Sequence, residues 1–207
     1  MIIHEDLVQL SDEWFDLKKG KFSGTDFTTV ANGKPATRKT LCYKKAAEII
    51  TGEYAESTFR NFNMDRGIEM EEEARMAFDL EVGVETREVG FIELSQYAGV
   101  SPDGLIGDYA GLELKCKDAH THLECLLKGD NKYKWQIQGA LFVSGRSIWY
   151  FASYNPSFPV GQKLYIKEHL PDPEAFEMLA KGLDESVANV QIILEQYKAL
   201  EVKNVCV

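Results

Sequence analysis

The sequence has little that would tie it to a membrane or to an oxidising compartment. No apolar run approaches the roughly 20 residues that span a bilayer. The opening residues, MIIHEDLVQLSDEWFDL, are acidic where a secretory signal would be basic. The 4 cysteines, Cys42, Cys116, Cys125 and Cys206, lack the close pairing of zinc sites, disulfide frameworks or iron–sulfur clusters. We expect a cytoplasmic protein with reduced thiols and no membrane partner.

The sequence also lacks the positive charge of a general nucleic-acid coat. Its formal net charge is −10, and such a field opposes phosphate binding. Any contact with DNA must therefore be local. Lysine and arginine are concentrated in the first quarter and in a later cluster, at Lys18, Lys19, Lys21, Lys34, Arg38, Lys39, Lys44, Lys45, Lys128, Lys132 and Lys134. Most charge runs of this kind are solvated surface.

The composition predicts one α/β (α+β) domain over residues 1–207, with a mixed central sheet flanked by helices. The chain shows no repeat, low-complexity tract or linker, and 44% of its residues are hydrophobic. Helices are expected over residues 40–51, 64–78, 133–144 and 172–201. Strands are expected over residues 84–94 with a turn at Gly90, 105–106, 112–116, 146–156 and 162–170.

The last helix carries an apolar stripe that favours packing on the core over a coiled-coil seam. Asp172 is its expected cap and Pro173 its first residue. The stripe consists of Phe176, Leu179, Leu183, Val187, Val190, Leu194 and Tyr197.

The stretch GVSPDGLIGDYAGLELKCKDA places an acid in a turn and an acid and a lysine on the strand that follows. Side chains alternate along a strand, so Glu113 and Lys115 share one face. The glycine-rich return between the two segments could bring Asp103 beside Glu113. Two close carboxylates need a cation, and Mg²⁺ takes carboxylate and carbonyl oxygens as ligands. Asp103, Glu113 and the carbonyl of Leu114 are therefore candidate metal ligands, with Lys115 placed to act on a water or on phosphoryl charge.

A simpler interpretation stays open at this point. Asp in a Pro-Asp-Gly turn is ordinary turn chemistry, and Glu-x-Lys on a strand can be an exposed ion pair. Two further polar residues support the site. Glu71 and Gln136 each lie on the otherwise apolar face of an expected helix, where a polar group needs a partner.

Four other residues have a structural alternative that is favoured over a functional one. His120 and His122 could touch a substrate but are expected to be exposed loop histidines. Tyr109 and Trp149 could stack on bases but are expected to pack in turns and strands.

The succession RGIEMEEEAR, SPDGL, GLELKCK, WQIQ and WYFASYNP resembles the lambda-type phage exonuclease (YqaJ-like) family of the PD-(D/E)xK nuclease superfamily. The resemblance runs in order from about Trp14 to Tyr165 and implies a restriction-endonuclease-like core. It implies that Asp103, Glu113 and the Leu114 carbonyl bind Mg²⁺ and that Lys115 acts on the attacking water. Glu71 matches the family's helix carboxylate, and Gln136 matches the glutamine of the following motif.

The resemblance further implies the reaction and its partners. Family members remove nucleotides from a 5′ end of duplex DNA with Mg²⁺, where two ions are expected and Mn²⁺ is a possible substitute. They leave a 3′ single strand for an annealing recombinase protein. The known enzymes are ring-shaped homotrimers, encoded by phage or prophage and working in the bacterial cytoplasm. On this basis residues 1–60 form a helical, basic DNA-end-binding part, residues 61–170 the catalytic core and residues 172–201 the C-terminal helix.

The N-terminal segment departs from the family pattern of Trp, three residues, Arg, then Gly and Ser. In WFDLKKGKFSGTD the matching residues are Trp14, Lys18, Gly20 and Thr25. Lys18 supplies positive charge for a 5′ phosphate without the two-pronged geometry of arginine. Thr25 could donate its hydroxyl to that phosphate or could be a helix cap. Two other functions stay open: an endonuclease of the restriction or junction-resolving type, and a noncatalytic DNA-end-binding module on a nuclease fold.

Overall fold

The computed structural model describes residues 1–55 and 62–204, with side chains over 1–55 and 70–200. Its helices are α1 (Asp12–Lys18), α2 (Asp26–Asn32), α3 (Pro35–Thr51), α4 (Phe62–Val82), α5 (Ala119–Lys128), α6 (Lys134–Ser144) and α7 (Pro173–Asn204). Its strands are β1 (Ile2–His4), β2 (Phe91–Ser95), β3 (Ala98–Val100), β4 (Gly104–Ile106), β5 (Ala110–Cys116), β6 (Ile148–Tyr154) and β7 (Leu164–His169). Two short 3₁₀ turns, η1 (Asn131–Tyr133) and η2 (Val160–Gln162), complete the described elements.

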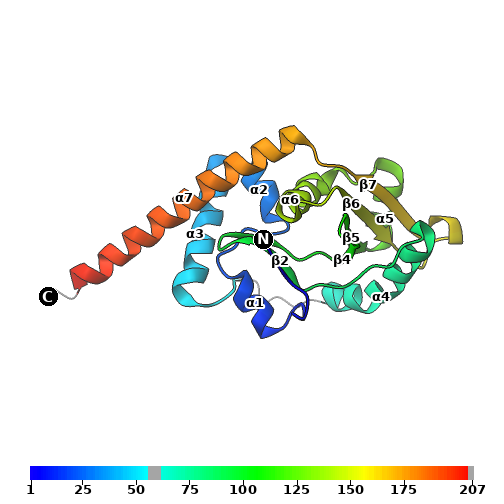
Figure 1. The fold of residues 1–207 in the computed structure, drawn as a ribbon, viewed down its shortest axis with the longest axis horizontal. Coiled ribbons are helices and arrows are strands. Elements are labelled where there is room, and N and C mark those ends of the chain that lie inside the picture. Colours follow the sequence, from blue (N-terminus) through cyan, green and yellow to red (C-terminus); the bar gives the residue numbers. More distant parts are fainter. Residues whose placement is uncertain (56–61, 205–207) are drawn as a thin grey trace.

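A four-stranded mixed sheet in the order β4-β5-β6-β7 forms the centre of the molecule. β5 and β6 run parallel, joined by a crossover through α5 and α6, and the outer pairs are antiparallel. The α4 side of the sheet buries Leu112 and Leu114 against Ala74 and Phe78. The opposite side packs on α6, so β5 is covered on both faces (Figure 1). This arrangement confirms the expected α+β fold class.

A second, three-stranded antiparallel sheet in the order β1-β2-β3 lies against α6. An isolated parallel bridge between Phe22 and Ala98 attaches the segment between α1 and α2 to β3. Since β3 leads directly into the Ser101–Pro102–Asp103 turn, the N-terminal segment and the turn that bears Asp103 are neighbours in space.

The helices α2, α3 and α7 form a third packed group around Phe22, Val30, Cys42, Ala46 and Val190. The first half of α7 covers α2 and α3, and its C-terminal end extends away from the rest of the chain (Figure 1). The predicted apolar stripe of α7 therefore packs on the core over most of its length, as expected. Its last residue, Tyr197, lies outside this packing and is 40% exposed.

The structure corrects several expected boundaries. α3 begins at Pro35 instead of Thr40, whose hydroxyl bonds back to the carbonyl of Ala36 inside the helix. The strand expected over 84–94 is confined to β2, and only Arg87 of the earlier stretch forms a bridge, to Leu105. The cap of α7 is confirmed, because Asp172 Oδ1 accepts bonds from the backbone of Glu174 and Ala175.

Helix α5 was not expected, and it changes the interpretation of the two histidines. His120 is exposed on this helix. His122 is fully buried, with Nδ1 2.9 Å from Ser153 Oγ and Nε2 2.8 Å from the Gln162 carbonyl. The prediction of exposed loop histidines was therefore wrong for His122, which fastens α5 to β6 and η2.

The expected reduced thiols are present where the structure describes them. Cys42, Cys116 and Cys125 are free, and Cys206 lies outside the described residues. Over the same described part of the chain, none of the helices combines the length and apolar character that a membrane crossing requires.

Candidate active site

Two hydrogen bonds to the backbone of β5 hold Asp103 against that strand. Its N–H donates to the Leu112 carbonyl at 3.1 Å, and its Oδ2 accepts the N–H of Leu114 at 2.6 Å. The last residue pair of the β4–β5 ladder is Gly104–Leu112. The Asp103 carboxylate therefore takes the place that β4 would occupy if it were longer.

The Leu114 carbonyl faces the same region as Asp103. The N–H and C=O of one residue point to the same side of a strand, and the Leu114 N–H already meets Asp103. This carbonyl lies beyond the last β4 pair, where no strand residue competes for it. The candidate ligand carbonyl of Leu114 therefore lies on the same edge of β5 as the Asp103 carboxylate.

The side chains of Glu113 and Lys115 project from the same face of β5, opposite the face that carries Leu112 and Leu114. Their spacing predicts this arrangement. Glu113 is only 4% exposed, and its Oε1 receives the Lys115 ammonium and the Gln136 amide, the latter at 2.6 Å from Nε2. Gln136 reaches it from the first turn of α6. The inward-facing glutamine thus has its partner, and β5 and α6 both contribute to one polar cluster.

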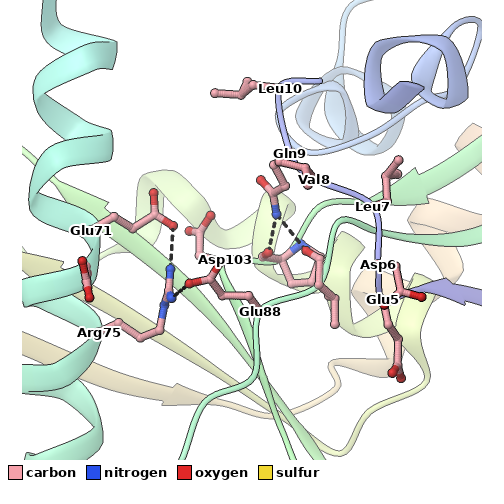
Figure 2. A pocket seen from close by; sticks show the side chains of 13 residues that line it. Glu5, Asp6, Leu7, Val8, Gln9, Leu10, Glu71, Arg75, Glu88 and Asp103 are labelled. Carbon is pink, nitrogen blue, oxygen red and sulfur yellow. Dashed lines mark hydrogen bonds and ion pairs between the residues drawn. The ribbon is translucent and has the colours of Figure 1, made fainter. Parts of the chain in front are cut away.

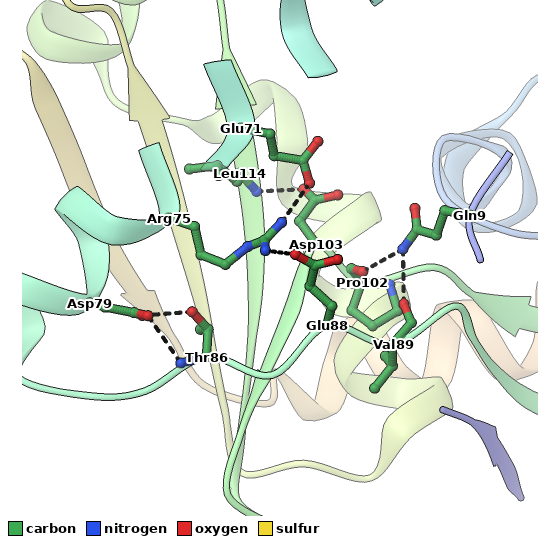
Figure 3. Close-up of polar contacts among 10 residues, drawn as sticks. All are labelled: Gln9, Glu71, Arg75, Asp79, Thr86, Glu88, Val89, Pro102, Asp103 and Leu114. Carbon is green, nitrogen blue, oxygen red and sulfur yellow. Dashed lines mark hydrogen bonds and ion pairs between the residues drawn. The ribbon is translucent and has the colours of Figure 1, made fainter. Parts of the chain in front are cut away.

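Glu71 approaches the cluster from α4 and brings a partner that sequence reasoning missed. Arg75, one helical turn later, donates from Nη2 to Glu71 Oε1 at 3.3 Å and also pairs with Glu88 (Figure 3). Asp103 lies close enough to Glu71 to raise its pKa, so the two carboxylates interact. The i,i+4 spacing of Glu71 and Arg75 on a helix was the signal that could have found this pair.

Burial and mutual repulsion raise the pKa values of the acids in the cluster. Desolvation is the main cause that raises the pKa of Glu113 to about 7, opposed by Lys115 and assisted by Asp103. Desolvation likewise raises the pKa of Asp103, against the effect of Lys115. The pKa of Glu71 rises through desolvation and through the charge of Asp103. A cation bound beside these carboxyl groups would favour their ionised forms and oppose these shifts.

The ammonium of Lys115 stays charged. Burial alone would lower its pKa, but Glu113 and Asp103 outweigh that effect and raise the pKa above its ordinary value. Lys117, two residues later, has a lowered pKa because of burial and the positive charges of Lys115 and Lys132. β5 and the residue that follows it therefore place two lysines, Lys115 and Lys117, near the acids.

A pocket of about 420 Å³ opens in front of Asp103 and Glu71 (Figure 2). α4 forms one wall, and the segment 5–10 lies across the opening from it. Gln9 secures that segment, because its Nε2 donates to the carbonyls of Val89 at 3.0 Å and Pro102 at 2.8 Å. No local sequence signal marks Gln9, since its partners lie 80 and 93 residues away.

The residues present fit a hard divalent cation, because two carboxylates and one carbonyl offer it oxygen ligands. They do not form a preformed cage of acids. Within residues 1–55 and 70–200, no three His, Cys, Asp or Glu side chains are already gathered around one metal position. Glu113 is engaged by Lys115 and Gln136, and Asp103 by the Leu114 N–H. The donor set of Asp103, Glu113 and the Leu114 carbonyl is all oxygen, as Mg²⁺ and Mn²⁺ prefer.

The two N-terminal candidates lie on the segment that the Phe22 bridge attaches to β3. The Lys18 ammonium stands 3.7 Å from the ring centroid of Trp14, whose indole N–H is 3.0 Å from both the Gly90 carbonyl and Ser101 Oγ. Thr25 occupies the N-cap position of α2, yet its hydroxyl makes no capping bond and the residue is exposed. The structure thus places Thr25 at a helix start without the capping role that was its alternative.

The two aromatic candidates differ. Trp149 is fully buried in the core, in contact with the backbone of Gly111, where an added Cβ would lie 2.3 Å from the ring. The expectation that it packs is confirmed. Tyr109 is 46% exposed in the turn between β4 and β5.

A mixed sheet with an acid in the turn before its first hairpin, and an acid and a lysine on the next strand, is the fold and motif of the PD-(D/E)xK nucleases. The chain belongs to the YqaJ-like viral recombinase domain family, whose model matches residues 13–147. The resemblance seen in the sequence motifs is thereby confirmed at the level of the family.

Solved structures agree with this assignment. An alkaline exonuclease from Laribacter hongkongensis, LHK-Exo, matches with a TM-score of 0.85 and 27% identity over 93% of this chain and 99% of that chain. The same enzyme in complex with dAMP matches equally well. A phage-related exonuclease from Haemophilus somnus 129PT shares the fold, with a TM-score of 0.69 and 15% identity over 85% of this chain and 96% of that chain. A search of curated proteins finds no significant match.

Proposed function

We propose that this protein is a Mg²⁺-dependent exonuclease that digests one strand of linear duplex DNA from its 5′ end. The 3′ single strand that remains would serve a single-strand annealing recombinase protein, and the products are 5′-mononucleotides. Family membership and the likeness to alkaline exonucleases support a nuclease in recombination. The observation that carries the proposal is that Asp103 bonds the Leu114 N–H and also lies close enough to Glu113 to help raise its pKa.

In this proposal Asp103, Glu113 and the Leu114 carbonyl hold the metal, with Glu71 beside them and room for a second ion. A bound Mg²⁺ would polarise the phosphoryl oxygen and lower the pKa of a bound water. Mn²⁺ could substitute, since it accepts the same oxygen ligands. The dAMP complex of LHK-Exo is consistent with a 5′-mononucleotide product.

The side chains around the acids have separable tasks. Lys115 is cationic at neutral pH in the metal-free protein, so we assign it to orienting the attacking water and offsetting phosphoryl charge, and not to removing a proton. Gln136 holds Glu113 Oε1 in place from α6. Lys18 and Thr25 would contact the 5′ phosphate as one cation and one hydroxyl donor.

The molecule as a whole would act as a homotrimeric ring around its substrate, as the family resemblance implies. A net charge of −10 suits such a ring better than a surface coat, because an acidic exterior repels DNA that is not threaded.

The proposal is tested with end-labelled linear duplex, Mg²⁺ and the full chain. Asp103→Ala removes one ligand and the acceptor for the Leu114 N–H, so cleavage should fall by at least about a thousandfold. Asp108→Ala in the exposed β4–β5 turn is the matched control and should keep its activity. Titration with Mn²⁺ by calorimetry gives a readout independent of turnover, and binding should disappear in the Asp103 variant only.

The substrate form separates the alternatives. Closed circular DNA should resist digestion, whereas an endonuclease would open it. A protein that binds ends without cleaving would be a noncatalytic module. Unchanged digestion by the Asp103 variant would remove the proposed metal role.

A further inference from the structure

A buried ionic group lies beneath the segment Lys18–Thr25, which we call the end loop. The Lys45 ammonium, on α3, is 3.1 Å from Asp26 Oδ2 and 3.5 Å from Glu48 Oε2. Lys45 and Glu48 are each 1% exposed. The sequence expectation that the basic cluster around Lys45 is solvated surface is therefore wrong for this residue.

Both carboxylates of the group also hold the backbone of the end loop. Glu48 Oε2 accepts the N–H of Gly20 at 3.0 Å, and Asp26 Oδ2 accepts the N–H of Ser23 at 3.2 Å. One ammonium thus links two carboxylates that restrain the end loop at two points, three residues apart. Since the charge-assisted bonds come from buried groups, they fix the loop more firmly than solvent-exposed bonds would.

The conformation of the loop depends on this support. Gly20 has a φ of +71°, and a Cβ at that position would come 2.5 Å from Ile49 Cγ1. The loop therefore lies directly on α3, one residue beyond Glu48. The Tyr54 ring adds a second link, because its centroid is 5.6 Å from the Lys18 ammonium and 5.8 Å from that of Lys45.

The end loop is also joined to the catalytic turn. Phe22 N–H donates to the Tyr97 carbonyl at 2.8 Å, and Gly99 N–H donates to the Phe22 carbonyl at 3.2 Å. These two bonds lock the middle of the loop to β3, which ends just before the turn that carries Asp103. A displacement of the loop on α3 would therefore change its relation to Asp103.

Packing alone does not account for this group. Burial of ions costs several kcal/mol per charge in general, and apolar side chains of the same volume would hold α2 against α3 equally well. Glu48 Oε1 has no hydrogen-bond partner among the described atoms, which adds to that cost. What the ions provide and apolar residues cannot is acceptors for the two loop N–H groups.

We propose that Lys45, Asp26 and Glu48 are positioning residues that set the end loop for recognition of the terminal 5′ phosphate of DNA. This inference rests on the proposed function, because it assigns the end loop to the DNA terminus. The three residues act through Lys18 and Thr25 and do not touch the substrate. Loss of the Lys45 charge leaves two carboxylates facing each other, so the Gly20 and Ser23 attachments shift apart.

The test compares Lys45→Met with the wild type on linear duplexes that carry 5′-phosphate or 5′-hydroxyl ends. Methionine keeps the length of the side chain and removes the ammonium. The KM for phosphorylated ends should rise about tenfold while kcat stays within about twofold, as expected when ground-state and transition-state binding are lost equally. The preference for phosphorylated over hydroxyl ends should fall by the same factor.

Cys42→Ala is the matched control for stability. Cys42 is buried on the same helix but packs toward α7, where its thiol meets the Ser186 carbonyl at 3.6 Å. This variant should lower the Tm without changing the end preference. Glu48→Gln serves as the second variant in case Lys45→Met does not fold. It keeps an acceptor for Gly20 and loses the charge, so it should reduce the preference in the same direction.

The outcomes are distinguishable. A folded Lys45→Met or Glu48→Gln protein that keeps the wild-type end preference overturns this inference alone. Equal attack of the wild type on both kinds of end also overturns it, since the end loop would then not recognise the phosphate. Absence of any cleavage by the wild type contradicts the proposed function instead.

Discussion

At the scale of single residues, the question raised by this acidic chain is why a lysine stands among its carboxylates. The structure answers it with contacts: Lys115 pairs with Glu113, and Arg75 pairs with Glu71. Asp103, Glu113 and Glu71 approach one another beside β5, and the two cations offset part of their repulsion. The remaining excess of negative charge is what a divalent cation would neutralise.

The pKa of Glu113 leads to a prediction for the metal-free protein. Its value is raised from an ordinary 4.5 to about 7, so the folded state holds a proton that the unfolded state releases. For a carboxyl whose folded pKa is raised, this contribution favours folding at low pH and is lost as pH rises from about 4.5 through 7. The free energy of unfolding in EDTA should therefore fall by up to about 3 kcal/mol over that range from this group.

Urea unfolding at pH 5, 6, 7 and 8 measures this effect, with Glu113→Gln as the comparison. The amide does not titrate, so the variant should show a flatter pH profile than the wild type. Parallel profiles of the two proteins would contradict the raised pKa of Glu113.

At the scale of elements, sequence patterns located β5, α6 and the long C-terminal helix α7. They succeeded where one local signal decides the structure. In β5, apolar and charged residues alternate. α6 begins and ends within a residue of the expected 133–144. α7 has a capping Asp172 followed by Pro173. The Glu113, Lys115 and Gln136 cluster follows from these elements because each presents one face to the same space.

Patterns failed where distant contacts decide. β1 and β3 have three residues each and exist because β2 lies between them. Helix α5 depends on the burial of His122 against Ser153, which lies 31 residues away. Helical spacing could have paired Arg75 with Glu71 and Lys45 with Glu48. Nothing near Gln9 reveals its partners, and nothing near Lys45 reveals Asp26. The roles of Lys18 and Thr25 stay predictions.

The ionic contacts of Asp130 should stabilise the mixed sheet beside the candidate active site. Asp130 is fully buried in the turn before η1 and receives Lys167 Nζ at 2.9 Å and His169 Nε2 at 2.5 Å. The two donors lie on β7, so Asp130 ties the far edge of the mixed sheet to the start of α6. Burial opposes its charge, yet bonds from Lys167 and His169 lower its pKa overall.

Asp130→Ala should destabilise the fold by about 2 kcal/mol, because the half-exposed Lys167 and the largely buried His169 lose a charged acceptor. In the wild type, the stability that Asp130 contributes is present above its unfolded pKa and is lost as pH falls through its lower folded pKa. Urea unfolding at pH 7 and pH 3 checks both points. Glu124→Gln, which removes an exposed partner of Lys128 and Lys132, is the control and should change little. An Asp130 variant as stable as that control would contradict this role.

At the scale of the whole molecule, the charge distribution predicts a strong response to salt. A chain of net charge −10 can hold DNA only through local lysines and arginines, and those contacts weaken as salt competes for the phosphates. The kcat/KM on linear duplex and the processivity should both fall as salt rises, with a loss of about tenfold or more in kcat/KM between about 50 and 200 mM. Thermal unfolding at the same salt concentrations shows whether the protein stays folded. A salt-independent rate would count against DNA binding through these local lysines and arginines.

The bridge between Phe22 and Ala98 fixes the position of the end loop relative to the turn that carries Asp103. In the proposed function, this connection through β3 would set the separation between the bound 5′ terminus and the bond to be cleaved. With that separation fixed, the enzyme would move along the DNA by a constant step. Lengthening the chain between Val100 and Asp103 would then shift the position of the cut along the DNA strand.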